Sequence, residues 1–209
     1  MIITALNLKK HDIKKIAELI YLVDHDTYLD VFKHKDKAIS AIEELLKIKA
    51  NIDGNKDDED INNDTNSEYV LLKGNEIKGY LQISKGKSHN YFNEILFLLK
   101  KLPLSIAYGF IKIKLLDSFV LSKIKEDDFY LAELAIIPNE QNKGFGTFLL
   151  NETLKMAKEE NFKRVVLDVK ISNKNARKLY EKLGFKIFNK RTGRLFNKNR
   201  GMYNMEYNL

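Results

Sequence analysis

The sequence predicts a mixed α/β protein of the α+β kind, in which helices flank a central sheet. Three observations support this prediction. Residues 134–150 have the pattern of a buried strand closed by Pro138, a turn containing Gly144 and Gly146, and an amphipathic helix. A Gly-Asn pair at 74–75 lies between two apolar runs, which is a strong hairpin signal. Apolar residues at helical spacing precede this hairpin.

The N-terminal part of the chain predicts one strand and two helices. Residues 1–5 form a short apolar run typical of a strand. Residues 10–23 and 35–49 carry apolar side chains every three to four positions, as amphipathic helices do. The polar stretch 24–28 ends the first of these helices, and we interpret it as a solvated turn in preference to a charged site.

Residues 51–67 are dense in Asp and Asn and almost empty of apolar side chains. Asp53, Asn55 and Asp57 stand at alternate positions, as ligands do in an EF-hand loop. The sixth position, however, is Asp58 instead of glycine, and no glutamate stands at the twelfth. We therefore predict a flexible acidic loop, with calcium binding as the less favoured alternative.

Two apolar pieces, at 91–102 and 104–121, flank Pro103 and predict an inserted helical segment at 86–127. Three roles remain open for it: a cap on the core, a wall of a substrate site, or a dimer surface. Membrane association is less favoured, because lysines interrupt both pieces without forming a polar face. These lysines are Lys100, Lys101, Lys112 and Lys114.

The remaining elements follow from the same patterns. Strands are expected at 69–73, 77–84, 130–137, 164–169, 186–191 and 202–207. A helix at 144–160 follows the glycine turn. Another helix is expected to begin at Asn173, a suitable N-cap, and to end at Gly184, a C-terminal stop signal.

The glycine turn before the 144–160 helix is suited to binding an anion. The first N–H groups of a helix have no partner inside it, and together with the macrodipole they favour a negative group. Glycines at 144 and 146 let such a group approach the backbone. The alternative is that they only let the helix pack against the sheet. The turn is neither a Walker P-loop, which needs Lys-Ser/Thr, nor a dinucleotide fingerprint, which needs a third glycine.

The string Gln141-x-x-Gly144-x-Gly146, preceded by L-A-I-I-P, resembles the acetyl-CoA-binding motif of the GCN5-related N-acetyltransferase (GNAT) family. In that family an Arg or a Gln heads the turn. Farther along the chain, a second string resembles the second signature of the same family. Its members are Asn173, Ala176, Leu179, Tyr180, Gly184 and Phe185. The two signatures stand in the family's order and cover residues 130–186.

The resemblance implies a GNAT fold: a mixed, mostly antiparallel, twisted sheet of about seven strands flanked by helices. The segment at 86–127 would then be an insertion between the third and fourth strands of a single domain spanning 1–209. The implied activity is transfer of the acetyl group of acetyl-CoA to a primary amine by direct attack. The acceptor would be a small molecule, a protein N-terminus or a lysine. The alternative is a CoA-binding regulatory domain with weak or no catalysis.

The resemblance also implies where the coenzyme lies. Main-chain groups of Leu134, Ala135 and Ile136 would pair with the pantetheine arm. Gln141 heads the turn, and N–H groups of the turn and helix start would hold the pyrophosphate. These residues are Asn142, Lys143, Gly144, Phe145, Gly146 and Thr147. Asn173 matches a position that often contacts the coenzyme in relatives, and a helix-capping role remains equally open.

Three residues are candidates for catalysis. Tyr180 matches the family's usual general acid, and a phenol of pKa about 10 can return a proton to a thiolate. An amine acceptor is mostly protonated at neutral pH, so a carboxylate is expected to remove its proton. Glu133 is an acid in the middle of a predicted strand, where acids are rare. Asp168 matches a glutamate in relatives that acetylate protein N-termini. We slightly favour Glu133.

Composition restricts the remaining possibilities. The chain has 209 residues and no cysteine, so disulfides, thiolate metal sites and a cysteine nucleophile are excluded. The net charge of +7 suits a polyanion such as coenzyme A, and nucleic-acid binding is less favoured because the lysines are spread along the chain. The four histidines lie far apart and predict no metal site. Without a signal-peptide or membrane-span pattern, we expect a cytoplasmic monomer or homodimer.

Overall fold

The computed structural model describes residues 1–52, 66–86, 91–195 and 198–209. Within these ranges the strands form one seven-stranded sheet in the order β1-β2-β3-β4-β5-β7-β6. The strands are β1 (Ile2–Ala5), β2 (Asn66–Lys73), β3 (Glu76–Lys85), β4 (Asp128–Ile136), β5 (Arg164–Lys170), β6 (Lys186–Leu195) and β7 (Lys198–Asn208). Neighbouring strands are antiparallel except for β4 and β5. The predicted mixed, mostly antiparallel sheet is confirmed.

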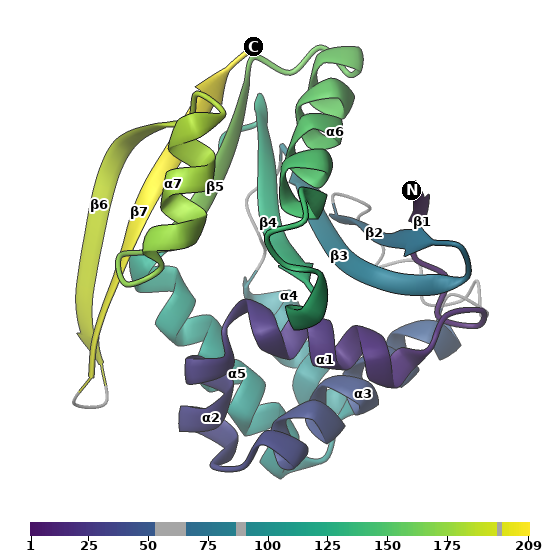
Figure 1. Cartoon of the computed structure of the whole chain (residues 1–209). Coiled ribbons are helices and arrows are strands. Elements are labelled where there is room, and N and C mark those ends of the chain that lie inside the picture. The colour runs from purple at the N-terminus through teal and green to yellow at the C-terminus, as the bar shows by residue number, and fades with distance from the viewer. Residues whose placement is uncertain (53–65, 87–90, 196–197) are drawn as a thin grey trace.

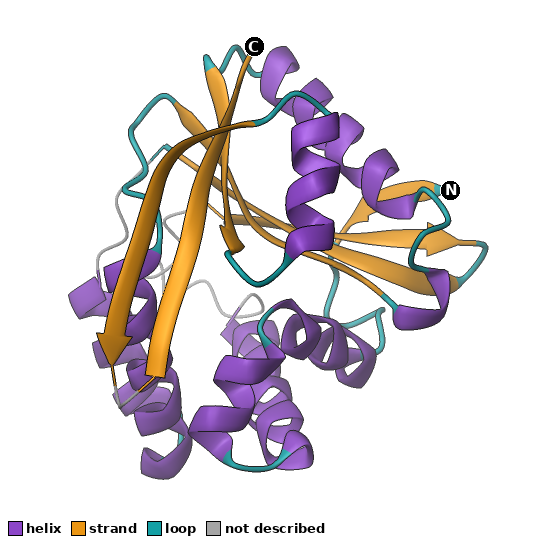
Figure 2. Cartoon of the chain, turned by 60° about the vertical axis from the view of Figure 1, so that its left-hand side comes forward, coloured by secondary structure: helices purple, strands orange, loops and turns teal. Residues whose placement is uncertain are grey.

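Helices cover the sheet in two groups (Figures 1 and 2). The first group lies at the lower end of the molecule in Figure 1 and contains α1 (Ile13–Val23), α2 (His25–Phe32), α3 (Lys35–Ile52), α4 (Tyr91–Lys101) and α5 (Leu104–Val120). The second group contains α6 (Phe145–Glu159) and α7 (Lys174–Lys182), and a short 3₁₀ turn (Pro138–Glu140) precedes α6. The two groups enclose the middle of the sheet from different sides.

Strand alternation divides the core between these two groups. Val70 and Tyr80 face a cluster built with the helices of the first group, whereas the adjacent Leu71 and Leu81 face a cluster that contains Leu149 of α6. Successive side chains of a strand point to opposite faces, so β2, β3 and β4 each supply both clusters. The sheet is therefore held from both sides, and its central strands β3 and β4 are fixed in position.

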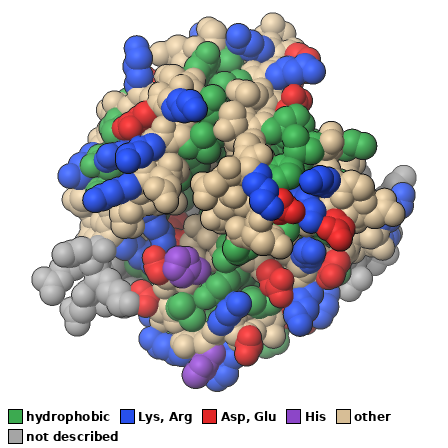
Figure 3. Space-filling view, in the orientation of Figure 1, with side chains coloured by type: hydrophobic (Ala, Val, Ile, Leu, Met, Phe, Trp, Pro, Cys, Tyr) green, Lys and Arg blue, Asp and Glu red, His purple; other side chains and the backbone are tan. Residues whose placement is uncertain are grey.

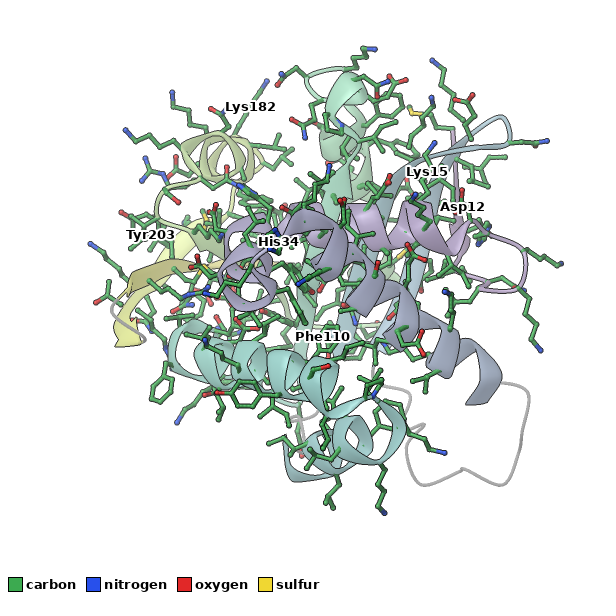
Figure 4. All side chains as sticks on the ribbon, turned by 90° about the horizontal axis from the view of Figure 1, so that it is seen from below. Asp12, Lys15, His34, Phe110, Lys182 and Tyr203 are labelled. Atoms are coloured by element: carbon green, nitrogen blue, oxygen red, sulfur yellow. The ribbon has the colours of Figure 1, made fainter. Side chains whose placement is uncertain are left out.

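The first helix begins later than predicted, and the second helix was not predicted from the sequence. α1 begins at Ile13 because the Asp12 carboxylate accepts a hydrogen bond from the Lys15 N–H (3.2 Å), which is an N-cap (Figure 4). The stretch 24–28, predicted to be a solvated turn, is instead the beginning of α2. Asp24 caps that helix through the Thr27 N–H (3.1 Å), and Thr27 is fully buried. Asp24 therefore stands at the end of α1 and also caps the start of α2.

Other boundaries agree with the predictions or extend them. The β2–β3 hairpin turns at Gly74, whose φ is +61°. The closing strands β6 and β7 are longer than predicted, reaching Leu195 and starting at Lys198. Most of the predicted acidic loop, 53–65, lies outside the described residues, and its ends at 51–52 and 66–67 belong to α3 and β2.

The predicted helical segment between the third and fourth strands is confirmed as α4 and α5, separated at Pro103. α5 packs closely on α2: a β-carbon on Gly109 would lie 2.5 Å from the Phe32 ring, and Phe32 meets Phe110 edge-on at 5.6 Å. Seen from the helical end, Phe110 sits on α5 next to the N-terminal helices (Figure 4). No helix among the described residues is long and apolar enough to cross a membrane.

Candidate active site

The parallel strands β4 and β5 separate halfway along their length. They pair from Asp128 opposite Arg164 to Leu131 opposite Leu167, and β4 then continues to Ile136 in contact with β3 alone. The register between β3 and β4 shifts at this point, which leaves Ala132 as a bulge residue. A bulge bends its strand and increases its twist, so β4 turns away from β5. The β5-facing main-chain groups of 132–135 thus lack a strand partner within the described part of the chain.

A cavity of about 1410 Å³ occupies this gap. One end is lined by the separated strands and by the beginnings of α6 and α7, including Gly144 and Asn173. The other end is lined by residues of α1 to α5 and of the β2–β3 hairpin, including Tyr28 and Asp117. We call these two parts the coenzyme end and the acceptor end. Glu133 on β4 and Tyr180 on α7 line the same cavity.

The turn at the coenzyme end leaves the start of α6 open. Gly144 has φ +85° and provides no side-chain cap, so the first N–H groups of α6 have no side-chain acceptor. A β-carbon on Gly144 would meet no heavy atom within 4 Å. The Gln141 side chain donates a hydrogen bond to the Ile136 carbonyl (3.1 Å), which ties the turn to the end of β4. The free strand edge therefore leads directly to an uncapped helix start.

Most of the predicted coenzyme residues line this cavity. They are Leu134, Ala135, Ile136, Gln141, Asn142, Gly144, Gly146, Thr147 and Asn173. Phe145 is not among them, because its side chain is buried in the core beneath α6. Lys143 is also outside the lining and forms an ion pair with Glu140 (3.1 Å). The Asn173 Oδ1 accepts a hydrogen bond from the Ala176 N–H (3.1 Å), so its predicted capping role is confirmed.

Tyr180 is half-buried on α7, and its ring lies 5.9 Å from that of Phe185. Burial raises the pKa of its phenol to about 12. The hydroxyl therefore remains protonated at any physiological pH and can act as a proton donor. Tyr180 accordingly satisfies the first requirement of a general acid.

Glu133 extends from the bent part of β4 into the cavity. Burial, and after it the negative charge of Glu68, raise the pKa of the Glu133 carboxyl to about 8, while Lys49 partly opposes this shift. The Glu133 Oε2 is buried and has no hydrogen-bond partner among the described residues. A carboxyl group with a pKa near neutrality is suited to taking up and releasing protons during catalysis.

Asp168 occupies a different kind of environment. Its carboxylate accepts hydrogen bonds from the Ser122 N–H (2.8 Å) and Oγ (2.7 Å), from the Tyr130 hydroxyl (2.8 Å) and from the Asn204 amide. These donors come from β4, β7 and the segment after α5. Asp168 thus joins α5 to the sheet and has its oxygens fully engaged.

Sequence reasoning missed most of the acceptor end. Its charged residues, apart from Glu133 and Asp168, are Asp24, Lys49, Glu68, Glu94, Lys114, Asp117 and Lys170. A signal was present for Asp117, the single acid within the apolar run of α5. Burial raises the pKa of Asp117 to about 7. The described residues contain no group of three His, Cys, Asp or Glu side chains arranged to hold a metal ion.

Separated strands that lead to an uncapped helix start are suited to an extended ligand with an anionic end. A sequence model of the acetyltransferase (GNAT) family matches residues 38–185, and the chain belongs to this family. The predicted GNAT fold is thereby confirmed.

The chain is similar over shorter stretches to N-terminal acetyltransferases. It is 43% identical over 56 residues to N-alpha-acetyltransferase 30 of Xenopus laevis, covering 27% of this chain and 20% of that protein. It is 35% identical over 81 residues to the [ribosomal protein bS18]-alanine N-acetyltransferase of Haemophilus influenzae, covering 36% of this chain and 55% of that protein. The chain thus matches about half or less of the length of these relatives.

Solved structures share the fold over the whole chain. The N-acetyltransferase from Staphylococcus aureus Mu50 superposes with a TM-score of 0.62 at 20% identity, covering 99% of this chain and 100% of that chain. The PaiA N-acetyltransferase from Thermoplasma acidophilum, solved in complex with coenzyme A, has a TM-score of 0.55 at 15% identity and covers 100% of this chain and 98% of that chain.

Proposed function

We propose that the protein transfers the acetyl group of acetyl-CoA to a primary amine by direct attack. One observation carries this proposal: the free edge of β4 leads into the uncapped start of α6, within the same cavity as Glu133 and Tyr180. Membership of the acetyltransferase family and the similarity to N-terminal acetyltransferases support it.

The residues at the coenzyme end fit coenzyme A. Leu134, Ala135 and Ile136 offer main-chain groups to an extended amide-bearing arm, as an added strand would require. The N–H groups of 142–147 offer donors to a diphosphate at a helix start, where the macrodipole also favours negative charge. Asn173, at the start of α7, lines the same end. Bound there, acetyl-CoA supplies an acetyl group activated as a thioester.

Glu133 is the proton acceptor in this proposal. An aliphatic ammonium group has a pKa of about 10.4, so the acceptor arrives protonated and must lose a proton before its nitrogen can attack. Glu133, with its pKa of about 8 and an unpaired buried oxygen, is better matched to this task than Asp168, whose oxygens are engaged by four donors. Asp168 is then a positioning residue.

Tyr180 is the proton donor. The amine nitrogen forms a C–N bond to the acetyl carbon as the C–S bond breaks, and the departing sulfur takes the proton of the Tyr180 hydroxyl. One proton of the ammonium group thus passes to Glu133 before the attack. The nitrogen loses a second proton as it becomes an amide, and this proton restores the Tyr180 phenolate. Glu133 releases its proton to water, so each turnover releases one proton. The N–H groups of the β4 edge are placed to stabilise negative charge on the acetyl oxygen.

The test is release of CoA thiol from acetyl-CoA in the presence of a panel of amines. We expect amine-dependent turnover, and mass spectrometry should find one added acetyl group on the amine. The second candidate function is a CoA-binding regulatory domain. Such a domain requires only the coenzyme end of the cavity and no catalytic residues. Tight CoA binding without turnover on any amine would favour that candidate and refute the transferase.

A further inference from the structure

We propose that the acceptor carries a second positive charge, held by Asp117 of α5 while its reacting amine lies at Glu133. This inference rests on the proposed function and specifies its substrate class: an amine with a second ammonium group at some distance along the molecule. The inference is supported by the balance of charges at the acceptor end, by the position of Tyr28 and by the attachment of α5 to the sheet.

The lysines that line the acceptor end are each paired with an acid. Lys49 lies 3.3 Å from Glu68, Lys114 contacts Glu94, and Lys170 contacts Asp24. Three acids of the lining remain after this pairing: Asp117, Glu133 and Asp168. The cavity therefore holds more carboxyl groups than cations.

The three remaining acids differ in how their oxygens are satisfied. Asp168 accepts hydrogen bonds from neutral donors, as described above. Glu133 has a buried oxygen with no partner, and Asp117 forms no ion pair and accepts no side-chain hydrogen bond among the described residues. Burial raises the pKa of Asp117 to about 7 and that of Glu133 to about 8, although the charges of Arg200 and Lys114 partly oppose the shift at Asp117 and the charge of Lys49 partly opposes the shift at Glu133. A buried carboxylate without a partner is unstable, so these two sites favour a bound cation.

Tyr28 shows that the two acids face the same space. It lines the cavity from α2, and the pKa of its phenol is well above the ordinary value. Burial is the main cause of this shift, and the charges of Glu133, Asp117 and Asp24 add to it. Tyr28, Glu133, Asp117 and Asp24 line the same cavity, and the charge of Asp117 also raises the pKa of Glu133. Asp24 is already neutralised by Lys170, and Arg200 lies 3.7 Å from it. Glu133 and Asp117 are left as the two anionic ends of one acceptor site.

The position of Asp117 is well defined because the end of α5 is attached to the sheet. The Arg191 side chain donates a hydrogen bond to the Leu121 carbonyl (2.9 Å), and the Asn204 amide donates to the Val120 carbonyl (3.3 Å). Ser122 is held by Asp168. These contacts come from β5, β6 and β7 and begin one helical turn after Asp117. The inserted helix thus delivers a carboxyl group to a fixed place in the cavity.

Other acceptor classes fit less well. An amine with a carboxylate or a phosphate at its far end needs an unpaired cation, and the lysines of the lining are all engaged. A monoamine leaves Asp117 without compensation. A diamine satisfies both unpaired acids, whether it is a free small molecule or the N-terminal amine and a basic side chain of one peptide.

Three acceptors of equal chain length test the proposal: 1,4-diaminobutane, butylamine and 4-aminobutanoate. We expect kcat/KM for the diamine to exceed that for butylamine by about tenfold or more, with 4-aminobutanoate the poorest, since one partly buried ion pair contributes on the order of a tenfold effect. Asp117→Asn should remove the diamine's advantage over butylamine, so that the ratio of the two kcat/KM values falls to about one. Asp36→Asn, on the exposed start of α3, is the matched control and should change neither. Peptides with and without lysine at the second position identify a protein source if the preference between them is larger than that between the diamine and butylamine.

Calorimetric titration of 1,4-diaminobutane into the protein gives a second readout that needs no turnover. We expect binding to wild type and Asp36→Asn and at least tenfold weaker binding to Asp117→Asn, with all three proteins folded by circular dichroism. Equal kcat/KM for diamine and monoamine, or equal titrations for wild type and Asp117→Asn, would overturn this inference and leave the transferase intact. No turnover on any amine, with diamine binding still dependent on Asp117, would refute the transferase and leave the dication site.

Discussion

The two ends of the cavity recognise their ligands by different means. The coenzyme end consists mainly of backbone: a strand edge at 132–135 and the start of α6 after Gly144. The acceptor end consists of charged side chains from α1 to α5 and the central strands. The first end offers donors and acceptors that every residue type possesses, whereas the second depends on particular acids and lysines.

This difference separates what is general in the molecule from what is specific to it. Main-chain groups hold a ligand of constant shape, and only glycine is required where that ligand comes close. Side chains determine which acceptor fits, and Asp117 is supplied by α5, between β3 and β4. On the face in view in Figure 3, Lys and Arg are spread over the surface with Asp and Glu between them. Substitutions at the two ends should therefore affect different measurements.

The largest effect is expected for Gly144→Val. A side chain there would project into the open space before α6 and block the N–H donors. Loss of two charge-assisted hydrogen bonds should weaken CoA binding by about a hundredfold or more. Gly74→Val is the matched control, because Gly74 also has positive φ and open space around its β-carbon but lies in the β2–β3 hairpin. The measurement is titration of CoA into both variants. An equal loss of CoA affinity in the two variants would show that backbone strain, and not a blocked helix start, causes the effect.

Tyr180→Phe is expected to lower kcat by about a hundredfold, since general acid catalysis typically contributes that much. CoA affinity should stay within about twofold, because the hydroxyl acts only as the thiolate leaves. Tyr108→Phe, on the exposed side of α5, should change neither quantity. Unaltered kcat in Tyr180→Phe would remove this residue from the mechanism.

Glu133 should set the pH dependence of catalysis. Its carboxyl must be ionised to accept a proton, so kcat/KM should rise with pH and level off above about 8, the pKa that burial gives this group. Glu133→Gln should remove this inflection and lower turnover below it. A profile that keeps its inflection in the variant would assign the proton acceptor elsewhere.

The same substitution should also change stability, with a predictable sign. The pKa of Glu133 is higher in the folded protein than in the unfolded chain, so the folded state binds more protons between about pH 4.5 and 8 and loses stability as pH rises through this range. Glu133→Gln should be more stable than wild type at pH 8 by on the order of 1–3 kcal/mol, and by less at pH 5. Thermal unfolding at the two pH values measures this difference, which a pH-independent result would contradict.

The smallest effect on chemistry is expected for Asp168→Asn. The variant weakens the hydrogen bonds from Ser122, Tyr130 and Asn204, so unfolding free energy should fall by about 1–3 kcal/mol. Catalysis should keep the same pH inflection, because in the proposed mechanism Glu133 accepts the substrate proton and Asp168 positions α5. An altered inflection with unchanged stability would reverse the roles of Asp168 and Glu133.

The coenzyme end could be predicted from sequence because its requirements are local. A strand, Gly144 and a helix start lie within one short stretch, and their spacing alone indicates an anion site. The separation of β4 from β5 could not be predicted from one stretch of sequence, because it depends on pairing between strands and on the bulge at Ala132.

The acceptor end could not be predicted in this way. Asp24, Glu94 and Asp117 lie far apart in sequence and meet only in the folded protein, so no spacing rule connects them. The stretch 24–28 was misread because an aspartate caps a helix start and also occurs in solvated turns. The unpaired state of Asp117 likewise depends on which lysines the fold assigns to other acids.

The most direct test is a crystal structure with CoA bound. The account predicts that the pantetheine arm hydrogen bonds to main-chain groups of 134–136 and that the diphosphate contacts N–H groups at the start of α6. The thiol should then point toward Glu133 and Tyr180. A bound coenzyme that leaves the β4 edge and the α6 start unoccupied would contradict it.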